Sequence, residues 1–346
     1  MQLLSVVVPA YNEQEVLPEF HRRTAAVLDA LPMQAEIIYI NDGSKDGTLQ
    51  VLQRLKADDA RIGIVDLSRN FGKETALTAG LDVARGDAVV VIDADLQDPP
   101  ELIPDLLRKW REGFDVVYAQ RESRDGESVA KKATAYAFYR LIQRMSRVEI
   151  PADTGDFRLL SRRALDALKQ LREQHRFMKG LFAWIGFPQV AVGYSRDPRF
   201  AGTTKFNYWR LWNFALEGIT SFTIAPLKFA TYVGAAIAAA AFAYAAWFVA
   251  KTLIFGDPVT GFPTLIVVTL FLGGVQITFL GIIGEYLGRM FDETKRRPLY
   301  FLKGLDLPAR TAAGGSPETR RDEASGRTGA EIQELSSKQG SPPEGG

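Results

Sequence analysis

The sequence contains no cysteine and only two histidines, His21 and His175. Disulfide bonds and zinc sites built from thiolates are therefore excluded, and a histidine-rich metal site is not expected. An excess of charge of either sign is also missing, because 42 Lys and Arg residues balance 41 Asp and Glu residues to a formal net charge of +1. A dedicated nucleic-acid-binding protein usually presents a strongly basic surface, so this balance argues against that class.

The N-terminus lacks the basic segment of a secretory signal peptide, so we expect the N-terminal part to remain in the cytoplasm. Charge is also missing from two long apolar stretches near the C-terminus, residues 229–250 and 258–284. Because about 20 helical residues cross a hydrocarbon core of about 30 Å, both stretches are long enough to span a bilayer. They predict transmembrane helices at about 229–251 and 263–285, within a membrane region at 226–290.

The charges that flank these stretches predict their orientation. The connection around 256–263 has no Lys or Arg, whereas Arg289, Lys295, Arg296 and Arg297 follow the second stretch. Under the positive-inside rule, both ends of the chain lie in the cytoplasm and the connection lies outside. The alternative is that both stretches are buried helices of a soluble protein.

The first 120 residues alternate between short apolar runs and amphipathic stretches. The apolar runs predict strands at 3–9, 36–41, 63–67, 88–93 and 115–119. The stretches between them predict helices near 13–31, 46–57, 72–84 and 100–111. This alternation implies right-handed crossovers and a mostly parallel, Rossmann-like α/β sheet. We expect one cytoplasmic domain over residues 1–225, since that length is ample for a single large core.

Two amphipathic stretches precede the membrane region, at about 128–147 and 206–223. The first has basic residues opposite an apolar face, a pattern typical of a helix that lies on anionic lipid. The second carries Trp209 and Trp212, which suit a membrane interface. For both, the alternative is a helix that packs on the core. A juxtamembrane segment at 291–308 precedes a polar, Gly- and Ser-rich stretch at 309–346, which predicts a disordered tail.

Polar motifs follow the predicted strands, and the carboxyl ends of parallel strands meet at one edge of a sheet, where ligands bind. The sharpest motif is DADLQDPP, in which Asp93, Asp95 and Gln97 alternate after an apolar strand. Such oxygen ligands suit Mg²⁺ or Mn²⁺, because Mg²⁺ is usually held by one or two carboxylates plus substrate phosphates. Capping of the next helix explains Asp98, which precedes two prolines, but does not explain Asp93 or Asp95.

PAYNE and NDGSKDGT are weaker signals when each is taken alone. Asp42 stands at a strand end and is placed to accept a hydrogen bond from a base or a ribose. Glu13 is placed to accept from a ribose hydroxyl. A turn followed by a helix cap explains Gly43 and Ser44 equally well.

Together these motifs resemble those of the family 2 glycosyltransferases of the GT-A fold. The resemblance is strongest to the polyprenyl-phosphate sugar transferases that are similar to dolichyl-phosphate-mannose synthase. It covers most of the chain, including the paired C-terminal spans of the bacterial, GtrB-like branch. The matching segments are SVVVPAYNE (5–13), NDGSKDGT (41–48), SRNFGKETAL (68–77), DADLQDPPE (93–101), GDFRLLSR (155–162) and RFAGTTKF (199–206).

The resemblance implies transfer of a hexose from a nucleotide sugar to a polyprenyl phosphate, with inversion at the anomeric carbon. Glucose from UDP-glucose is the expected donor group, with mannose from GDP-mannose and a modified arabinose as alternatives. Undecaprenyl phosphate is the expected acceptor, and Mg²⁺ or Mn²⁺ the expected cofactor. It also implies a multi-pass protein of the bacterial inner membrane. Glycines in the second span suggest a homo-oligomer packed through the transmembrane helices.

Carried over to this sequence, the residues of the family's site fall into four groups. The nucleotide-sugar contacts are Pro9, Tyr11, Glu13, Asp42, Asp93 and Asp95. The metal ligands are Asp93, Asp95 and Gln97. The phosphate contacts are Arg121, Lys131, Arg199 and Lys205. The catalytic carboxylate is Asp156.

The role of Asp156 is left open by the chemistry. An acceptor phosphate has a second pKa of about 6, so it is largely deprotonated at neutral pH and a strong base is not obligatory. Asp156 either deprotonates the residual acid form or orients the sugar or the metal. For the neighbouring Arg158, the alternative to a role in the site is a structural one, in which it pairs with an acid near the sheet.

Two other functions are alternatives. A processive polysaccharide synthase shares the early motifs, but the sequence has no QxxRW motif and two spans do not enclose a channel. A non-catalytic, nucleotide-sugar-binding scaffold of the membrane has the same fold. The intact set of Asp42, Asp93, Asp95 and Asp156 favours an enzyme.

Overall fold

The structure is a computed structural model that describes residues 2–121, 154–194, 225–255 and 261–309. Both predicted interface helices, residues 256–260 of the predicted outer connection and the predicted tail from residue 310 onward lie outside the described residues.

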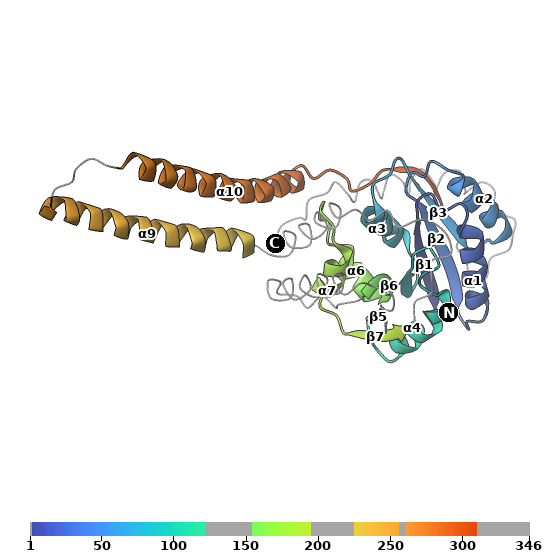
Figure 1. Cartoon of the computed structure of the whole chain (residues 1–346). Helices are drawn as coiled ribbons and strands as arrows, with labels where there is room; N and C mark the ends of the chain where they lie inside the picture. Colours follow the sequence, from blue (N-terminus) through green and yellow to red (C-terminus); the bar gives the residue numbers. More distant parts are fainter. Residues whose placement is uncertain (1, 122–153, 195–224, 256–260, 310–346) are drawn as a thin grey trace, which may run out of the picture.

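A mixed eight-stranded sheet forms the centre of the α/β domain, in the order β7-β5-β6-β4-β1-β2-β3-β8 (Figure 1). The strands are β1 (Leu3–Ala10), β2 (Gln34–Asn41), β3 (Ile62–Leu67), β4 (Ala88–Val91), β5 (Val116–Arg121), β6 (Thr154–Ser161), β7 (Gln189–Tyr194) and β8 (Leu302–Asp306). The pairs β1–β2, β1–β4, β2–β3 and β5–β7 are parallel. Strands β6 and β8 pair antiparallel with their neighbours. The predicted fold class, an α/β domain with a mostly parallel sheet, is confirmed.

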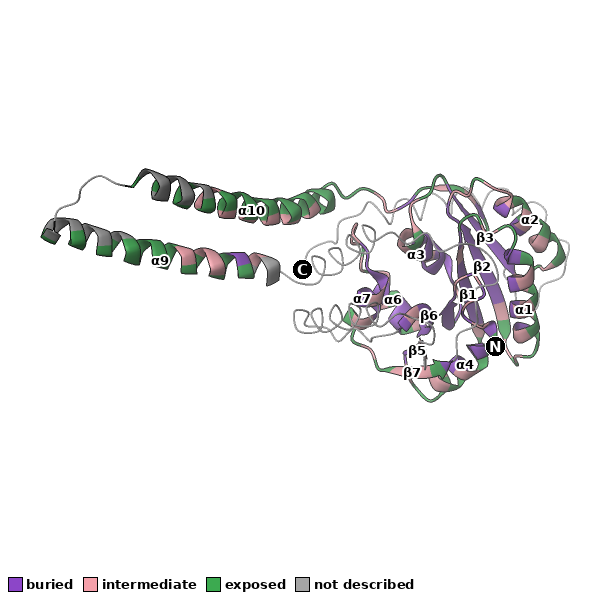
Figure 2. Cartoon of the chain, viewed as in Figure 1, coloured by how far each residue is buried: buried purple, intermediate pink, exposed green. Residues whose placement is uncertain are grey.

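Helices cover both faces of this sheet. They are α1 (Leu17–Asp29), α2 (Thr48–Asp58), α3 (Lys73–Val83), the 3-10 helix η1 (Pro100–Leu102), α4 (Ile103–Arg111), α6 (Arg162–Leu168) and α7 (Met178–Trp184). One core lies under α1, α2 and α4, and the other under α3, α6 and α7 (Figure 1). Val6 and Val8 of β1 enter the first core and Val7 enters the second. Burial on both faces explains why the strands are almost continuously apolar (Figure 2).

Two long helices, α9 (Ala225–Phe255) and α10 (Phe262–Thr294), lie side by side and extend away from the α/β domain (Figure 1). Within the described residues, the segment Phe271–Thr294 is long and apolar enough to cross a membrane, with a mean hydropathy of 1.3, and Phe229–Tyr244 is a shorter apolar stretch. Large apolar side chains along both helices are exposed (Figure 2). An exposed apolar surface of this kind marks a site of membrane or protein contact.

After α10 the chain returns to the α/β domain, where β8 pairs antiparallel with β3 at the edge of the sheet. Leu305 of β8 and the preceding Tyr300 are buried in the same core as α3. The sequence did not predict β6, β7 or β8. Strand β6 lies between β4 and β5, so the fourth and fifth predicted strands are not neighbours.

Candidate active site

The loops that follow β1 and β2 are joined by hydrogen bonds from backbone amides. The amide of Asn12 donates to Ser44 Oγ at 3.1 Å, and the amide of Lys45 donates to Asn12 Oδ1 at 2.9 Å. The amide of Glu13 donates to Thr48 Oγ1 at 2.9 Å. Asn12 has a φ of 56°, a left-handed conformation that Asn tolerates better than most residues. PAYNE and NDGSKDGT are therefore parts of one connected unit, with Glu13 inside it.

Asp42 connects this unit to the SRNFGK loop, residues 68–73, which follows β3. Its carboxylate is buried and accepts from the amides of Phe71, at 2.7 Å, and Gly72, at 3.0 Å. Burial raises the pKa of Asp42, and the two amides only partly oppose this effect. Gly43, with a φ of +60°, lies so close to this loop that a Cβ would stand 2.3 Å from the carbonyl carbon of Arg69. In this structure Asp42 holds the SRNFGK loop, and its predicted contact with the nucleotide stays a prediction.

Lys73, the first residue of α3, joins the carboxylates at the edge of the sheet. Its Nζ lies 2.7 Å from Asp93 Oδ2 and also pairs with Asp156 Oδ2. Asp93 follows β4 and Asp156 lies in β6, so the antiparallel pairing of these strands brings the two carboxylates together. Desolvation opposes the charge of Lys73, but the two carboxylates outweigh it and raise the pKa of the ammonium. Lys73 was not predicted as a site residue, although it follows Gly72 at a predicted helix start.

Asp156 is buried, and one of its oxygens is unused. Desolvation on its own raises the pKa of this carboxyl, but Lys73, Lys179 and Arg158 outweigh it and lower the pKa to about 2. Asp156 Oδ1 is buried without a hydrogen-bond partner among the described residues. A buried acceptor without a partner is costly, so this oxygen marks a place for a polar group of a ligand or a cation.

Two further titratable residues near Asp156 were not singled out in the sequence. Burial and the charge of Asp156 raise the pKa of Glu74 to about 7, while Lys73, Lys179 and the amide of Met178 oppose this shift. Burial lowers the pKa of Lys179. The cluster therefore contains both positive and negative groups, and the pKa of each group depends on the charges beside it.

Arg158 supports Asp156 through the backbone. Its guanidinium lies 3.9 Å from the centre of the Phe182 ring and donates to the carbonyl oxygens of Gly155, at 2.8 Å, and Asp156, at 3.3 Å. Burial lowers the pKa of Arg158 to about 10, although Asp156 and Glu74 oppose this shift. These contacts favour the structural role, in which Arg158 positions the strand that carries Asp156.

The DADLQDPP loop folds back on itself after β4. Leu96 has a φ of 58°, and Asp95 Oδ1 accepts from the amide of Gln97 at 3.1 Å. The capping interpretation of Asp98 is wrong. Pro99 is the N-cap of η1, and no side chain accepts a hydrogen bond there. The buried carboxylate of Asp98 instead accepts from the hydroxyl of Tyr194, because β7 brings this tyrosine close to the loop.

The residues at this edge fit a divalent cation that is held partly by a substrate. No group of three or more His, Cys, Asp or Glu side chains is arranged for a metal within the described parts of the chain. Asp93 and Asp95 nevertheless stand at alternate positions after β4, and Lys73 joins Asp93 to Asp156, whose other oxygen has no partner among the described residues. Mg²⁺ commonly takes one or two carboxylates and completes its shell with waters and substrate phosphates, so this donor set suits it.

Of the remaining predicted site residues, three are described by the structure and three are not. Pro9 is at the end of β1, and Tyr11 is exposed in the loop after it. Arg121 is the last residue of β5, where its backbone is in register with Tyr194. The predicted phosphate contacts Lys131, Arg199 and Lys205 lie outside the described residues.

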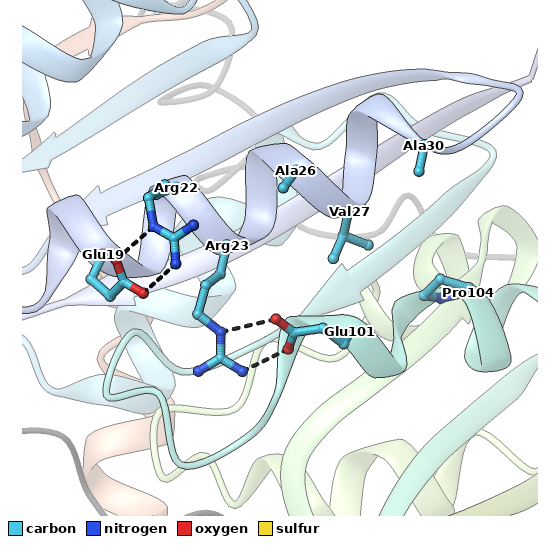
Figure 3. Close-up of a pocket in the computed structure, with 8 residues that line it drawn as sticks. All are labelled: Glu19, Arg22, Arg23, Ala26, Val27, Ala30, Glu101 and Pro104. Carbon is cyan, nitrogen blue, oxygen red and sulfur yellow. Dashed lines mark hydrogen bonds and ion pairs between the residues drawn. The ribbon is translucent and has the colours of Figure 1, made fainter.

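A separate hollow of about 610 Å³ lies between α1 and the segment that begins α4 (Figure 3). The charged residues that line it pair with one another, Arg22 with Glu19 at 2.7 Å and Arg23 with Glu101 at 2.7 Å. These pairs already satisfy the charges of the hollow. We therefore place the candidate active site at the cluster of Lys73, Asp93 and Asp156.

Comparison with known proteins places the chain in a family. Residues 5–169 match Glycosyl transferase family 2, and residues 225–290 match the GtrB C-terminal hairpin. An uncharacterized glycosyltransferase of Synechocystis sp. is 55% identical over 302 residues, which is 87% of this chain and 95% of the relative. The chain belongs to glycosyl transferase family 2. The predicted family and its GtrB-like branch are confirmed, and this family 2 protein is a glycosyltransferase.

Other similar proteins have more specific names. The bactoprenol glucosyl transferase of Shigella phage SfV is 47% identical to this family 2 glycosyltransferase over 300 residues, which is 87% of this chain and 98% of the relative. Among solved structures, mannosyl-3-phosphoglycerate synthase from Rubrobacter xylanophilus has a TM-score of 0.44 and 21% identity. That comparison covers 62% of this chain and 71% of the synthase.

Proposed function

We propose that this family 2 glycosyltransferase transfers glucose from UDP-glucose to undecaprenyl phosphate, with inversion at the anomeric carbon. The observation that carries the proposal is the extent of the similarity to bactoprenol glucosyl transferases. The relative from Shigella phage SfV is 47% identical over 87% of this chain, and bactoprenol is a polyprenol. The chain matches both the family 2 domain and the GtrB hairpin, and a hairpin in the membrane would bring the domain close to a lipid acceptor.

The donor is proposed to bind across the loops after β1, β2 and β4. Pro9, Tyr11, Glu13 and Asp42 are the proposed contacts of the nucleotide. The hydrogen bonds that connect the first two loops support this assignment, because a preorganised site loses less entropy when its ligand binds.

The diphosphate is proposed to lie at the cluster of Lys73 and the carboxylates. Asp93 and Asp95, with Gln97, would hold Mg²⁺ or Mn²⁺ there. When bound, the ion neutralises negative charge on the leaving diphosphate. The ammonium of Lys73, 2.7 Å from Asp93, adds a fixed positive charge at the same place.

The acceptor phosphate is proposed to attack the anomeric carbon directly. A new bond forms between this carbon and a phosphate oxygen of the acceptor, while its bond to the diphosphate breaks. Because the acceptor phosphate is largely deprotonated at neutral pH, it does not need a strong base. Asp156, whose pKa is lowered to about 2, is a poor base and is better suited to orient the sugar or a cation through its unused oxygen. Arg121, Lys131, Arg199 and Lys205 are the proposed phosphate contacts.

The hairpin is proposed to cross the bacterial inner membrane twice, with the α/β domain in the cytoplasm. Strand β8 follows α10 and pairs with β3, so the chain enters and leaves the hairpin on the same side. The basic residues Lys295, Arg296 and Arg297 directly after α10 favour the cytoplasmic side. This arrangement holds the active site near the headgroups, where the phosphate of a polyprenyl lipid lies.

The test uses purified full-length protein in lipid nanodiscs with undecaprenyl phosphate and Mg²⁺. Radiolabelled UDP-glucose, UDP-galactose, UDP-N-acetylglucosamine and GDP-mannose are offered separately, and label in the organic extract is counted. We expect label from UDP-glucose that EDTA abolishes. Asp156→Asn should remove this label, whereas Asp166→Asn, a substitution at the exposed carboxylate of α6, should not.

Each other result contradicts a part of the proposal. Label from a different nucleotide sugar refutes glucose as the transferred sugar. Label that is insensitive to EDTA refutes the metal. Label in a long polymer identifies a processive synthase, and binding of UDP-glucose without any product refutes the acceptor.

A further inference from the structure

Three hollows follow one another along the C-terminal third of α10. The first, of about 510 Å³, is apolar and is lined by Gly284 and Gly288 among others. It shares Met290 and Thr294 with the second, of about 460 Å³. The second shares His175 with a third, of about 550 Å³. The shared residues show that neighbouring hollows adjoin one another, and the three together are called the α10 track below.

The far end of the α10 track is positively charged. Arg69 of the SRNFGK loop and Arg297, which follows α10, both line the third hollow. The guanidinium of Arg69 stacks on the ring of Phe71, 4.0 Å from its centre, so its edge is held in place. The carboxylate of Asp292 is engaged by the ring of His175 at 3.2 Å. Two arginines and one aspartate, whose carboxylate already has a partner, therefore line this hollow, and the balance of charge favours an anion.

This charged end is joined to the active site by the SRNFGK loop. Arg69 lies four residues before Lys73, a stretch that spans at most about 14 Å even when fully extended. The amide of Ser68 donates to the carbonyl oxygen of Phe301 at 2.9 Å, which ties the loop to the segment after α10. One loop thus connects the α10 track with the cluster of Asp93 and Asp156.

We propose that the α10 track is the loading site of the lipid acceptor. The isoprenoid chain lies along the glycine-lined face of α10, and its terminal phosphate rests on Arg69 and Arg297 before transfer. The first hollow is apolar and the third carries two arginines, which match the chain and the phosphate of a polyprenyl phosphate, while Glu173, Arg289 and Glu293 line the hollow between them. A guanidinium binds a phosphate through two parallel hydrogen bonds, which explains the choice of arginine at both positions. The identity of the acceptor rests on the proposed function, but its binding does not require turnover.

Gly288 offers a variant that fills the track without disturbing the helix. A Cβ built on Gly288 has no heavy atom within 4 Å, so the side chain of Gly288→Leu begins in open space, and Gly288 lines the first hollow. Leucine also favours a helix more than glycine does. The matched control is Gly281→Leu, because Gly281 is on the same helix and equally open but does not line the three hollows.

The first measurement is binding of undecaprenyl phosphate to the full-length protein in nanodiscs, without any nucleotide sugar. We expect Arg69→Gln and Arg297→Gln each to weaken binding by about 10-fold or more, the loss of one charge-assisted contact. Gly288→Leu should weaken it by a similar factor, and Gly281→Leu should leave it unchanged. In turnover assays, the KM for the lipid should rise in Gly288→Leu while the KM for UDP-glucose stays constant.

Competing lipids and ions test the identity of the ligand. If phosphatidylglycerol or inorganic phosphate displaces undecaprenyl phosphate at equal concentration, the site is not an acceptor site and the proposal is wrong. It is also wrong if Gly288→Leu acts only by changing the solution mass of the particle. If undecaprenyl phosphate binds as described but no sugar is transferred to it, the α10 track stands while the proposed function fails.

Discussion

Lys73 is the residue on which the charge balance of the candidate active site depends. Its ammonium contacts both Asp93 and Asp156 and screens the repulsion between these two carboxylates. We expect Lys73→Met to lower kcat by about 10²–10³-fold, the usual cost of removing one preorganised group that stabilises developing charge. Labelled lipid product, measured over a range of UDP-glucose concentrations, gives kcat and KM separately. Lys73→Arg keeps the positive charge and should retain part of the activity, whereas an unchanged kcat in Lys73→Met contradicts this role.

Glu74 predicts a dependence of stability on pH. Its pKa is raised from 4.5 to about 7 in the folded protein. Between these values the folded protein keeps a proton that the unfolded chain has released, so stability falls as pH rises from 4.5 to 7. Glu74→Gln removes this loss of folding stability, so the variant should be more stable than wild type at pH 8 by up to about 3 kcal/mol. At pH 4.5 and below the two proteins should be nearly equal.

Thermal unfolding of the full-length protein in detergent, at pH 4.5 and pH 8, measures this difference. A gap between the melting temperatures of Glu74→Gln and wild type that is the same at both pH values refutes the assignment.

At the scale of single residues, the sequence predicted the carboxylates of the candidate active site but not the charged residues beside them. Asp93 and Asp95 were predictable because helix capping does not explain acidic residues directly after an apolar strand, whereas Asp156 was predicted from the resemblance to the family alone. Lys73 and Glu74 were not, since charged residues in the first turn of a helix are common and usually exposed. Their importance comes from β6, which enters the sheet beside β4 and brings Asp156 to them.

At the scale of elements, the loops of the site depend on close contact between backbones. Gly43→Ala places a Cβ 2.3 Å from the carbonyl carbon of Arg69, in addition to straining a φ of +60°. Gly113→Ala is the matched control, because Gly113 has a φ of +104° but no heavy atom near its Cβ. We expect a loss of about 1–2 kcal/mol for the control, which reports backbone strain alone.

The clash should make Gly43→Ala clearly more destabilising than Gly113→Ala, and it should also raise the KM for UDP-glucose. Thermal unfolding and initial rates measure the two effects. Equal losses of stability in both variants, with an unchanged KM in Gly43→Ala, contradict the role of this contact.

The elements that the sequence predicted are those whose pattern is local. Strands β1 to β5 and their helices follow from runs of Val and Ile between amphipathic stretches, which burial on both faces of the sheet requires. Strand β8 has the sequence LKGLD, in which Lys, Gly and Asp interrupt the apolar pattern. It becomes a strand because β3 offers it an edge, and such a tertiary pairing is not visible in local composition.

At the scale of the whole molecule, β8 fixes the hairpin to the α/β domain. Truncation after residue 295 removes Tyr300 and Leu305 from the core and exposes the edge of β3. Burial of one such side chain is worth about 1.5–3 kcal/mol, so we expect a loss of several kcal/mol and a clearly lower melting temperature. Truncation after residue 309 removes only the tail that the sequence predicts to be disordered. It should leave the melting temperature and the activity unchanged, and a large effect of this second truncation refutes the prediction.

Because β3 pairs with β8, the sheet is completed only late in the synthesis of the chain. Strand β3 ends at Leu67, but β8 begins only at Leu302, after both helices of the hairpin. A ribosome that makes this chain therefore completes an N-terminal domain whose sheet still has an open edge, and open edges invite pairing with other chains. The edge closes only when α9 and α10 have been made and the chain has come back to the domain. Completion of the sheet of the catalytic domain thus waits for synthesis of the hairpin, and a chain that ends before β8 leaves this edge open.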